Sequence, residues 1–336
     1  MSMVLYPLAF VLALLLGLYF TPIARAAALR FGIVDRPDGN LKNQREPVPY
    51  LGGIAVYLAF LIALGLVIEF DKMLLGILLA GTLTLLVGLV DDFGVLTPLA
   101  KLTGQAVAIF ALLRGGMVIE LVEVPEGLRW PLSALWLLAV CNAFNLLDIM
   151  DGLAAGVGAI AALAMGLVAV FTEQYPLALA ALAMAGALVG FSVFNFHPAR
   201  IYLGDAGALA TGLTLGALSL AMEWTELSPA GFLAPLAIFA VPLGDTMYVT
   251  LLRARAGKPF WHGSPDHFPL RLRRRFGGRV RPAVGVCYGV AGLGAVIGVG
   301  SVGLWSWQAA LWLVGGFFTA FGLLLLSLLR VEAPSP

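Results

Sequence analysis

The feature that most constrains this chain is the alternation of long apolar runs with short polar connections. A helix needs roughly 17 to 25 apolar residues to cross the hydrocarbon core of a bilayer. Eleven runs approach this length, at residues 4–20, 51–69, 73–90, 98–114, 131–147, 152–171, 177–195, 205–222, 230–252, 283–303 and 307–329. The sequence therefore predicts an all-α polytopic membrane protein with about eleven transmembrane helices, built as one integral membrane domain over residues 1–336.

The composition agrees with this class and excludes others. Hydrophobic residues make up 61% of the chain and charged residues 12%, about half the charged share of an average soluble domain. The net charge of +1 argues against a nucleic acid partner, because proteins that bind the phosphate backbone carry a concentrated basic excess. Cys141 and Cys287 lie inside apolar runs and are expected to be free thiols.

The charged residues predict an orientation. Arginine and lysine gather in the connections after the first and ninth runs, and such residues are retained on the cytoplasmic side. Both connections are odd-numbered, so the N-terminus is expected outside and the C-terminus in the cytoplasm. Glutamates then fall mainly outside, where the stretch 118–128 alternates in a way that predicts a small β-hairpin. The aspartates predicted on the cytoplasmic side are Asp35, Asp38, Asp91, Asp92, Asp148, Asp151, Asp205, Asp245 and Asp266.

Many of these aspartates stand where an apolar run ends or begins. An ionised carboxylate at a bilayer boundary is costly unless it binds a cation or reacts, so such acids indicate a functional site. We expect the cytoplasmic connections near 21–50, 91–98, 196–204 and 253–282 to form that site. In the pair Asp91-Asp92, one acid could hold a cation while its neighbour polarises a substrate; the alternative is a solvated helix end capped by Gly94.

A second motif runs from Asn142 to Asp151. Its polar residues, Asn142, Asn145, Asp148 and Asp151, recur every three positions and would form one stripe on a continuing helix. We interpret the stripe as the lining of a polar cavity; hydrogen bonding between helices is the alternative.

A third motif places Asn195, Arg200 and Asp205 around a short loop before the eighth run. Free N–H groups at the start of that helix would attract anions. Asp205 could act only as an N-cap, but a cap does not explain the other two residues. His197, in the same loop, is expected to be structural.

The last large connection contains His262, Asp266, His267 and Arg271, which together are candidates for polyphosphate recognition. The basic cluster 273–275 is interpreted as a topology signal or a contact with anionic lipid. Zinc is not favoured, because neither a cysteine pair nor a regular ligand spacing accompanies the histidines.

Oxygen ligands without soft ones favour a hard divalent cation. Mg²⁺, with Mn²⁺ as an alternative, is typically held by one or two carboxylates together with substrate phosphates. Acids, basic loops and a membrane setting together predict phosphoryl chemistry on a lipid phosphate, where catalysis consists largely of positioning and charge neutralisation.

The ordered motifs resemble those of the polyprenyl-phosphate N-acetylhexosamine-1-phosphate transferases, the initiating enzymes of O-antigen and wall teichoic acid synthesis, and more distantly the phospho-MurNAc-pentapeptide translocase. The resemblance covers roughly residues 30–275. It rests on Asp35-Arg-Pro with Lys42, Pro49-Tyr-Leu-Gly52-Gly53, Gly88-Leu-Val-Asp91-Asp92, Lys101 with Gln105, Asn145-Leu-Leu-Asp148-Ile-Met-Asp151-Gly, and Pro198-Ala-Arg200-Ile-Tyr-Leu-Gly204-Asp205.

The resemblance implies transfer of a sugar 1-phosphate from a UDP-sugar to a polyprenyl phosphate, with Mg²⁺ and with release of UMP, on the cytoplasmic face of a bacterial inner membrane. By resemblance, Asp205 is the strongest candidate for a metal ligand, and Asn145 and Asp148 are further candidates. Asp91 and Asp92 would position or deprotonate the lipid phosphate. Asp148 and Asp151 would line the catalytic cleft, and Lys42 and Lys101 would meet phosphates. The oligomeric state is left open, with a homodimer as one alternative.

One motif departs from the family pattern. Where relatives often carry His-x-His-His-Arg, this chain has His267-Phe-Pro269-Leu270-Arg271. GlcNAc is the expected donor sugar, and UDP-MurNAc-pentapeptide is the alternative donor. A cation-coupled transporter or lipid flippase is the alternative from another class; it would use the acids as cation sites, and a kink near Pro242 could turn Asp245 toward the cleft.

Overall fold

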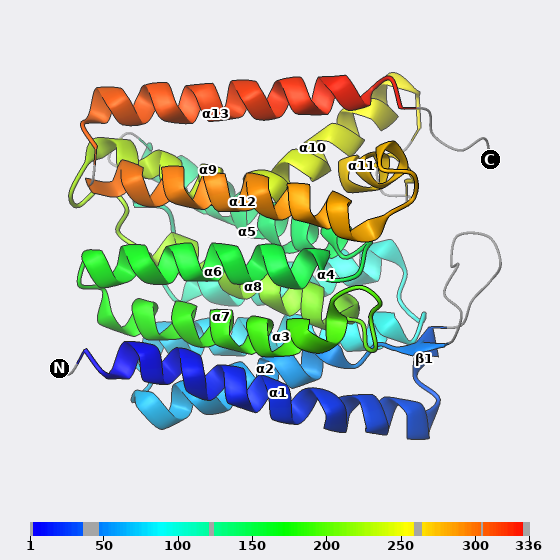
Figure 1. Cartoon of the computed structure of the whole chain (residues 1–336). Coiled ribbons are helices and arrows are strands. Elements are labelled where there is room, and N and C mark those ends of the chain that lie inside the picture. The colour runs from blue at the N-terminus through cyan, green and yellow to red at the C-terminus, as the bar shows by residue number, and fades with distance from the viewer. Residues whose placement is uncertain (1–2, 36–46, 121–123, 259–263, 304, 332–336) are drawn as a thin grey trace.

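The computed structural model describes residues 3–35, 47–120, 124–258, 264–303 and 305–331. Its long helices lie side by side in one bundle, and the N- and C-termini lie at opposite ends of that bundle (Figure 1). The prediction of an all-α polytopic membrane protein is confirmed.

The first eight helices are α1 (Leu5–Phe31), α2 (Gly52–Val67), α3 (Lys72–Asp92), α4 (Pro98–Arg114), α5 (Glu126–Leu147), α6 (Leu153–Phe171), α7 (Tyr175–Asn195) and α8 (Gly204–Ala221). The later elements are the 3-10 helix η1 (Pro229–Leu233), α9 (Ala234–Ile238), α10 (Ala240–Arg255), α11 (Phe268–Arg275), α12 (Val280–Gly303) and α13 (Trp307–Leu328). Two short strands, β1 (Val34–Asp35) and β2 (Val48–Pro49), pair antiparallel.

Each of the eleven predicted runs contains a helix. By length and composition, seven of the described helices could cross a membrane, or up to eight if one bent pair counts as a single span. The ninth run is that pair: the segment Pro229–Ile238 and helix α10 meet at an angle of 66°. The prediction of one continuous helix over 230–252 is therefore wrong. Pro242 lacks an N–H group, which is tolerated because it lies in the first turn of the new helix α10.

The hairpin predicted near 118–128 is also wrong for the residues that the structure describes. Residues 118–120 form no strand, and helix α5 begins at Glu126, directly after Pro125. A proline fixes φ near the helical value, so it readily precedes a helix start. Residues 121–123 of that stretch lie outside the described residues.

The centre of the bundle is built from helices rich in alanine and glycine. Helices α6, α7 and α8 bury most of their residues, and small side chains allow their backbones to approach closely. A Cβ atom added to Gly186 would lie 2.1 Å from the carbonyl oxygen of Phe10, so helix α1 packs directly on the backbone of α7.

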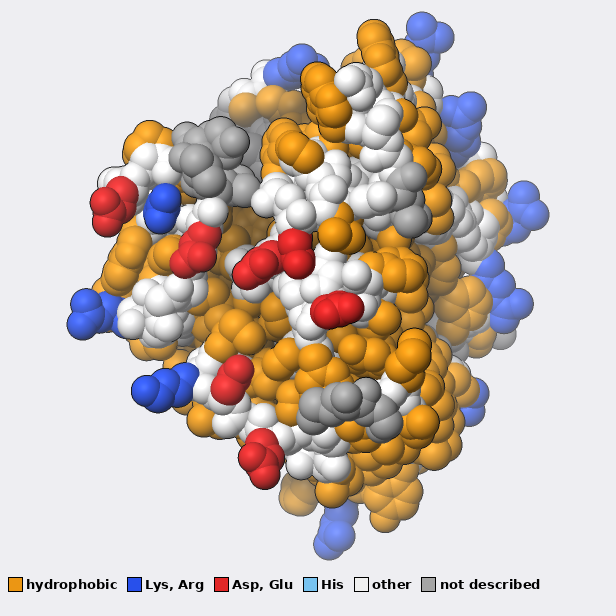
Figure 2. Space-filling view, turned by 90° about the vertical axis from the view of Figure 1, so that its left-hand side faces the viewer, with side chains coloured by type: hydrophobic (Ala, Val, Ile, Leu, Met, Phe, Trp, Pro, Cys, Tyr) orange, Lys and Arg blue, Asp and Glu red, His pale blue; other side chains and the backbone are white. Residues whose placement is uncertain are grey.

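The acids sort by end of the bundle. Acidic side chains are spread over the end that carries the N-terminus, among hydrophobic ones (Figure 2). The exposed acids at that end, among the described residues, are Glu69, Asp71, Glu120, Glu126, Glu173, Glu223 and Glu226. The aspartates that end apolar runs lie at the opposite end, where a cavity opens.

Candidate active site

A cavity of about 1160 Å³ opens at the end of the bundle opposite the N-terminus. Segments far apart in the sequence line it, and its walls carry both acids and arginines. The charged lining residues are Arg25, Asp35, Asp91, Asp92, Asp148, Asp151, Arg200, Asp205 and Arg273, with Asn195 and His197 beside them.

Two glycines allow the start of α8 to reach this cavity. A Cβ atom on Gly88 of α3 would lie 2.4 Å from the carbonyl oxygen of Asp205, and one on Gly53 of α2 would lie 2.2 Å from the backbone nitrogen of Gly207. Any side chain at either position would push α8 away. The first turn of α8 is therefore held between α2 and α3.

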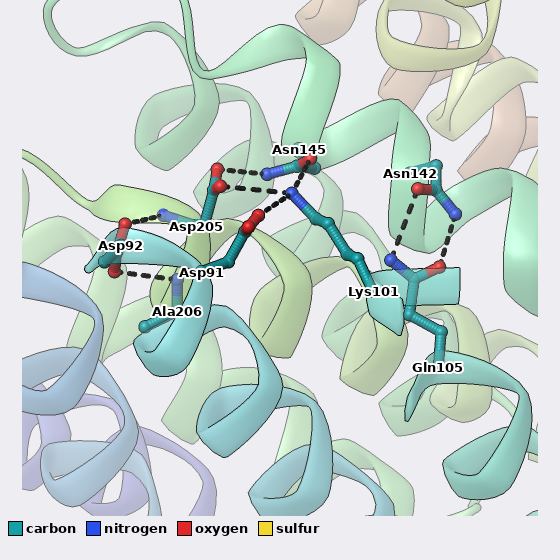
Figure 3. A network of polar contacts seen from close by, with 8 residues as sticks. All are labelled: Asp91, Asp92, Lys101, Gln105, Asn142, Asn145, Asp205 and Ala206. Atoms are coloured by element: carbon teal, nitrogen blue, oxygen red, sulfur yellow. Dashed lines mark hydrogen bonds and ion pairs between the residues drawn. The ribbon is translucent and has the colours of Figure 1, made fainter. Parts of the chain in front are cut away.

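Asp92 caps this first turn of α8. The backbone N–H groups of Asp205 and Ala206 donate to the two carboxylate oxygens of Asp92, at 2.8 Å and 3.2 Å (Figure 3). A carboxylate at a helix N-terminus satisfies free N–H groups and interacts favourably with the helix dipole. The prediction that free N–H groups would attract anions here is therefore wrong for these two groups, because Asp92 already occupies them.

Asp205 is not itself a cap. Helix α8 starts at Gly204, and the Asp205 side chain points away from its own backbone toward α4 and α5 (Figure 3). The amide nitrogen of Asn145 donates to Asp205 Oδ1 at 2.6 Å, and Lys101 Nζ donates to Asp205 Oδ2 at 3.1 Å.

Lys101 lies at the centre of the resulting network. Its ammonium nitrogen is 2.7 Å from Asp91 Oδ2, 2.8 Å from Asn145 Oδ1 and 3.1 Å from Asp205 Oδ2. These three oxygens come from α3, α5 and α8, and the lysine comes from α4 (Figure 3). Four helices thus converge on one position that holds a cation.

The polar stripe that begins at Asn142 does not form one surface, because α5 ends at Leu147 and does not continue to Asp151. Its residues divide into three parts, and Asn145 is the part that belongs to the Lys101 network. Asn142 faces the buried Gln105 and donates to its carbonyl oxygen at 2.7 Å, so it joins α4 to α5 and does not line the cavity. Asp148 and Asp151 follow the helix end and line the cavity.

Asp148 has a perturbed acidity. Burial, followed by the neighbouring charges of Asp205 and Asp92, raises the pKa of Asp148 to about 8. A cation bound in this part of the cavity would lower that pKa, because it would stabilise the ionised carboxylate.

Asp151 orders the loop before α8. It accepts a hydrogen bond from Ala199 N at 3.1 Å, and its Oδ2 lies 2.6 Å from His197 Nδ1. The expectation that His197 has a structural contact is met by this pair. Both side chains also border the cavity.

The comparisons with known proteins agree with this geometry. The chain is 36% identical to a Streptomyces coelicolor protein named as a glycosyltransferase, over 96% of this chain and 76% of the relative. It is 32% identical to the decaprenyl-phosphate N-acetylglucosaminephosphotransferase of Mycolicibacterium smegmatis, over 78% of this chain and 73% of the relative. It is 33% identical to the phospho-N-acetylmuramoyl-pentapeptide-transferase of Bacillus cytotoxicus, over 64% and 73%. A family model described as glycosyl transferase family 4 matches residues 74–223.

The chain belongs to glycosyl transferase family 4. It is a multi-pass membrane enzyme of this family, which confirms the predicted resemblance. The matched residues 74–223 include the four network residues Asp91, Lys101, Asn145 and Asp205.

The network of this transferase offers the donor set of a hard cation. Its ligands are carboxylate and amide oxygens, which suit Mg²⁺ and Mn²⁺ better than softer ions. Among the described residues, no group of three or more His, Cys, Asp or Glu side chains is arranged to hold a metal. In the network, one of the three oxygens is an amide oxygen, and the ammonium of Lys101 contacts all three. The oxygens of Asp91, Asn145 and Asp205 are therefore of the kind that suits a hard cation.

From the sequence, Arg273 is interpreted as a topology signal or a contact with anionic lipid. In the structure, Arg273 lies in the wall of the active-site cavity. Arg200 also lines the cavity, and its guanidinium lies 5.5 Å from the centre of the Phe194 ring. Arg25 and Tyr202 also line the cavity and were not singled out from the sequence. The signal for Arg25 was its place in a basic connection, which does not tell one arginine from another.

The last large loop is placed differently from its prediction. Asp245 is 1% exposed, its Oδ2 lies 2.6 Å from His267 Nδ1, and it accepts from Phe268 N at 2.8 Å. Despite the break before α10, Asp245 therefore faces the start of α11 and not the cleft. Neither residue lines the cavity. Because Asp245 is buried in this pair, it does not face the cleft as the transporter alternative requires.

Arg271 also serves the scaffold in the described structure. Its guanidinium donates to the carbonyl oxygens of Leu328 and Val331, at 3.1 Å and 2.9 Å, and to Asp266 Oδ1 at 2.7 Å. The structure does not bring Asp266, His267 and Arg271 to the cavity that holds Asp205, because these bonds direct them toward α10 and α13. Their predicted role in polyphosphate recognition has no support from this arrangement. Lys42 and His262, also predicted to bind substrate, lie outside the described residues.

Proposed function

We propose that this transferase moves a HexNAc 1-phosphate, GlcNAc 1-phosphate in the first place, from a UDP-sugar to a polyprenyl phosphate. A lipid phosphate oxygen would attack the phosphorus that bears the sugar, the bond from that phosphorus to UMP would break, and a polyprenyl-pyrophosphoryl sugar would form. The observation that carries the proposal is the position where three oxygens surround one cation at the edge of a cavity lined by arginines.

The chemistry of this step fits the charges in the cavity. Phosphoryl transfer is catalysed mainly by positioning and by neutralising the charge that develops on phosphate oxygens. Mg²⁺, when bound, would supply the larger part of that neutralisation. Asp91, Asn145 and Asp205 would hold it, with Asp148 in the same cavity. Arg200 and Arg273, which both line the cavity, would bind the anionic substrate.

Lys101 and Asp92 take different parts in this proposal. Lys101 would contact a phosphate group once the oxygens of Asp91, Asn145 and Asp205 are shared with a divalent cation. Asp92 would act mainly by holding α8, and with it Asp205, in place, since its carboxylate already accepts two backbone N–H groups.

The cavity is proposed to open on the cytoplasmic face of a bacterial inner membrane. The basic connection between α1 and α2 and the one between α10 and α12 lie at the end of the bundle where the cavity opens, and basic connections are retained in the cytoplasm. The donor and acceptor would then meet where UDP-sugars are made.

GlcNAc is preferred over MurNAc-pentapeptide as the donor unit because the relative matched over the larger share of this chain is named for N-acetylglucosamine. A homodimer is one arrangement for the enzyme, and the site described here lies within one chain.

The test is UMP release by purified protein in detergent with polyprenyl phosphate and a panel of UDP-GlcNAc, UDP-GalNAc and UDP-MurNAc-pentapeptide. We expect UMP from UDP-GlcNAc only when both the lipid and Mg²⁺ are present, and no UMP after EDTA. Protein lacking the acceptor lipid is the matched control. If UDP-MurNAc-pentapeptide is the one donor of the panel that releases UMP, it replaces UDP-GlcNAc as the donor in this proposal. Folded protein that releases no UMP from any donor would contradict the proposal.

A further inference from the structure

A second cavity, of about 570 Å³, lies away from the active site, between α11 and the end of α13. Its lining residues are Arg275, Leu323, Leu326, Ser327, Arg330 and Val331. Helix α13 runs along the bundle, and its last turns lie at the same end of the bundle as α11 (Figure 1). No residue of this cavity also lines the active-site cavity.

Two arginines form the charged part of this second cavity. Arg275 ends α11, and Arg330 follows the end of α13. Both are exposed, and within the described residues neither guanidinium has a hydrogen bond or ion pair to protein. The described lining contains no carboxylate. Two cations that line one cavity without a counter-charge attract an anion with several oxygens, such as a phosphate group.

The remaining wall of the cavity is apolar and faces outward. Leu323 is 62% exposed and Leu326 is 59% exposed, and both belong to α13, a helix long and apolar enough to cross the membrane. Leucines on the outer face of such a helix contact acyl chains. The cavity thus combines a cationic end with an apolar wall. A phospholipid matches both parts, because its phosphate is anionic and its acyl chains are apolar.

The walls of the cavity are held in register by the scaffold contact of Arg271. Its bonds to the carbonyl oxygens of Leu328 and Val331 join α11 to the last turn of α13. These bonds hold together the two helix ends that carry Arg275 and Arg330. This distinguishes the pair from scattered surface arginines.

We propose that this second cavity binds one anionic glycerophospholipid, with its phosphate between Arg275 and Arg330 and its acyl chains along Leu323 and Leu326. The site differs from the one proposed for the acceptor, because it lies on the other side of α11 from the active-site wall residue Arg273. It also divides the basic cluster 273–275 by role, since Arg273 lines the active-site cavity and Arg274 donates to the carbonyl oxygen of Pro265.

The test is lipid binding by native mass spectrometry of the full chain, comparing phosphatidylglycerol with phosphatidylcholine. The double variant Arg275→Gln/Arg330→Gln is compared with Arg30→Gln/Arg279→Gln, which removes the same charge from the same end of the protein. We expect the preference of the wild type for phosphatidylglycerol to fall about tenfold in the first variant and to stay unchanged in the second. Thermal unfolding in detergent shows that both variants are folded.

Three outcomes would overturn the proposal. An equal loss in both variants would mean that the lipid responds only to the general positive charge of this end. Complete competition by millimolar inorganic phosphate would identify a free-anion site, and competition by polyprenyl phosphate at equimolar amounts would identify a second acceptor site. None of these measurements involves turnover, so their result does not depend on the proposed transferase activity.

Discussion

Two regions of this transferase contain the same kinds of residue and use them in opposite ways. At the edge of the active-site cavity, Lys101 lies among Asp91, Asn145 and Asp205, and the three charged side chains are 16% to 37% exposed. At the junction of α10 and α11, Asp245 pairs with His267, and these side chains are 1% and 4% exposed. In the sequence, Asp91 and Asp205 stand at the ends of apolar runs, and Asp245 lies inside the run 230–252.

The difference lies in access to water and to other cations. A pair that no solvent reaches cannot exchange its partner without leaving a buried charge, so it stabilises the fold. In the partly open network, Asp91 and Asp205 line the cavity, so we expect that another cation can replace the ammonium of Lys101 there. An aspartate in or beside an apolar run is therefore not sufficient evidence for catalysis.

The largest expected effect comes from Asp205→Asn. The amide keeps the shape of the side chain but removes the charge, and we expect UMP release to fall about 1000-fold because charge neutralisation supplies much of the catalysis. Steady-state UMP release per folded molecule measures this. Glu226→Gln, the same chemical change at the opposite end of the bundle, should keep wild-type turnover. Wild-type rates in Asp205→Asn would remove this residue from the site.

The closed region is tested by Asp245→Ala. Removing one partner of a buried pair leaves His267 and the N–H of Phe268 without an acceptor, so we expect a loss of about 3 kcal/mol of folding free energy. Thermal unfolding in detergent measures it. Asp151→Ala breaks the more exposed pair with His197 and should cost about 1 kcal/mol. Equal losses in the two variants would mean that burial does not distinguish these pairs.

The exchange of cations in the open network is tested by Lys101→Met. Without substrates, we expect the affinity for Mg²⁺ or Mn²⁺ to rise about tenfold, because no ammonium competes for the three oxygens. Titration calorimetry with Mg²⁺, or electron paramagnetic resonance with Mn²⁺, reports this without turnover. Lys101→Arg, which keeps the charge, should retain weak binding. Unchanged or weaker binding in Lys101→Met would show that the lysine does not occupy the cation position.

The smallest effect concerns the wall arginine Arg273. We expect Arg273→Gln to raise the KM for the UDP-sugar about threefold with little change in kcat, because a partly exposed arginine contributes modestly to binding an anion. Arg279→Gln is the matched control outside the cavity wall and should leave KM unchanged. A change in kcat alone would place Arg273 nearer to the reacting phosphate than the cavity wall suggests.

Several features of the fold could be predicted from the chain. The apolar runs gave the helices, since each predicted run contains one. The separation of glutamates from aspartates gave the end at which the site lies. A kink was expected near Pro242, but the bend of 66° lies earlier, between Ile238 and Ala240, where the composition stays apolar and does not mark the position of the break.

The site residues were predicted unevenly. Asp91, Asp148, Asp151, Asp205 and Arg200 do line the cavity, whereas the candidates of the last loop that the structure describes do not. The period of three that joined Asn142 to Asp151 assumed a helix that ends at Leu147. Periodicity relates residues on one helix and carries no information about the helix that faces them.

The sequence by itself determined that this protein is a helical membrane enzyme with acids at one end of its bundle, because hydrophobicity and charge act on each segment separately. Only the tertiary structure decided which of those acids hold a cation and which hold the scaffold. Gly53 and Gly88 allow α8 to pack against α2 and α3, and that contact directs Asp92 to a helix end and Asp205 to Lys101. The physical reason is that a carboxylate accepts hydrogen bonds from the donors that lie nearest in space, and here those donors belong to helices that are distant in the sequence.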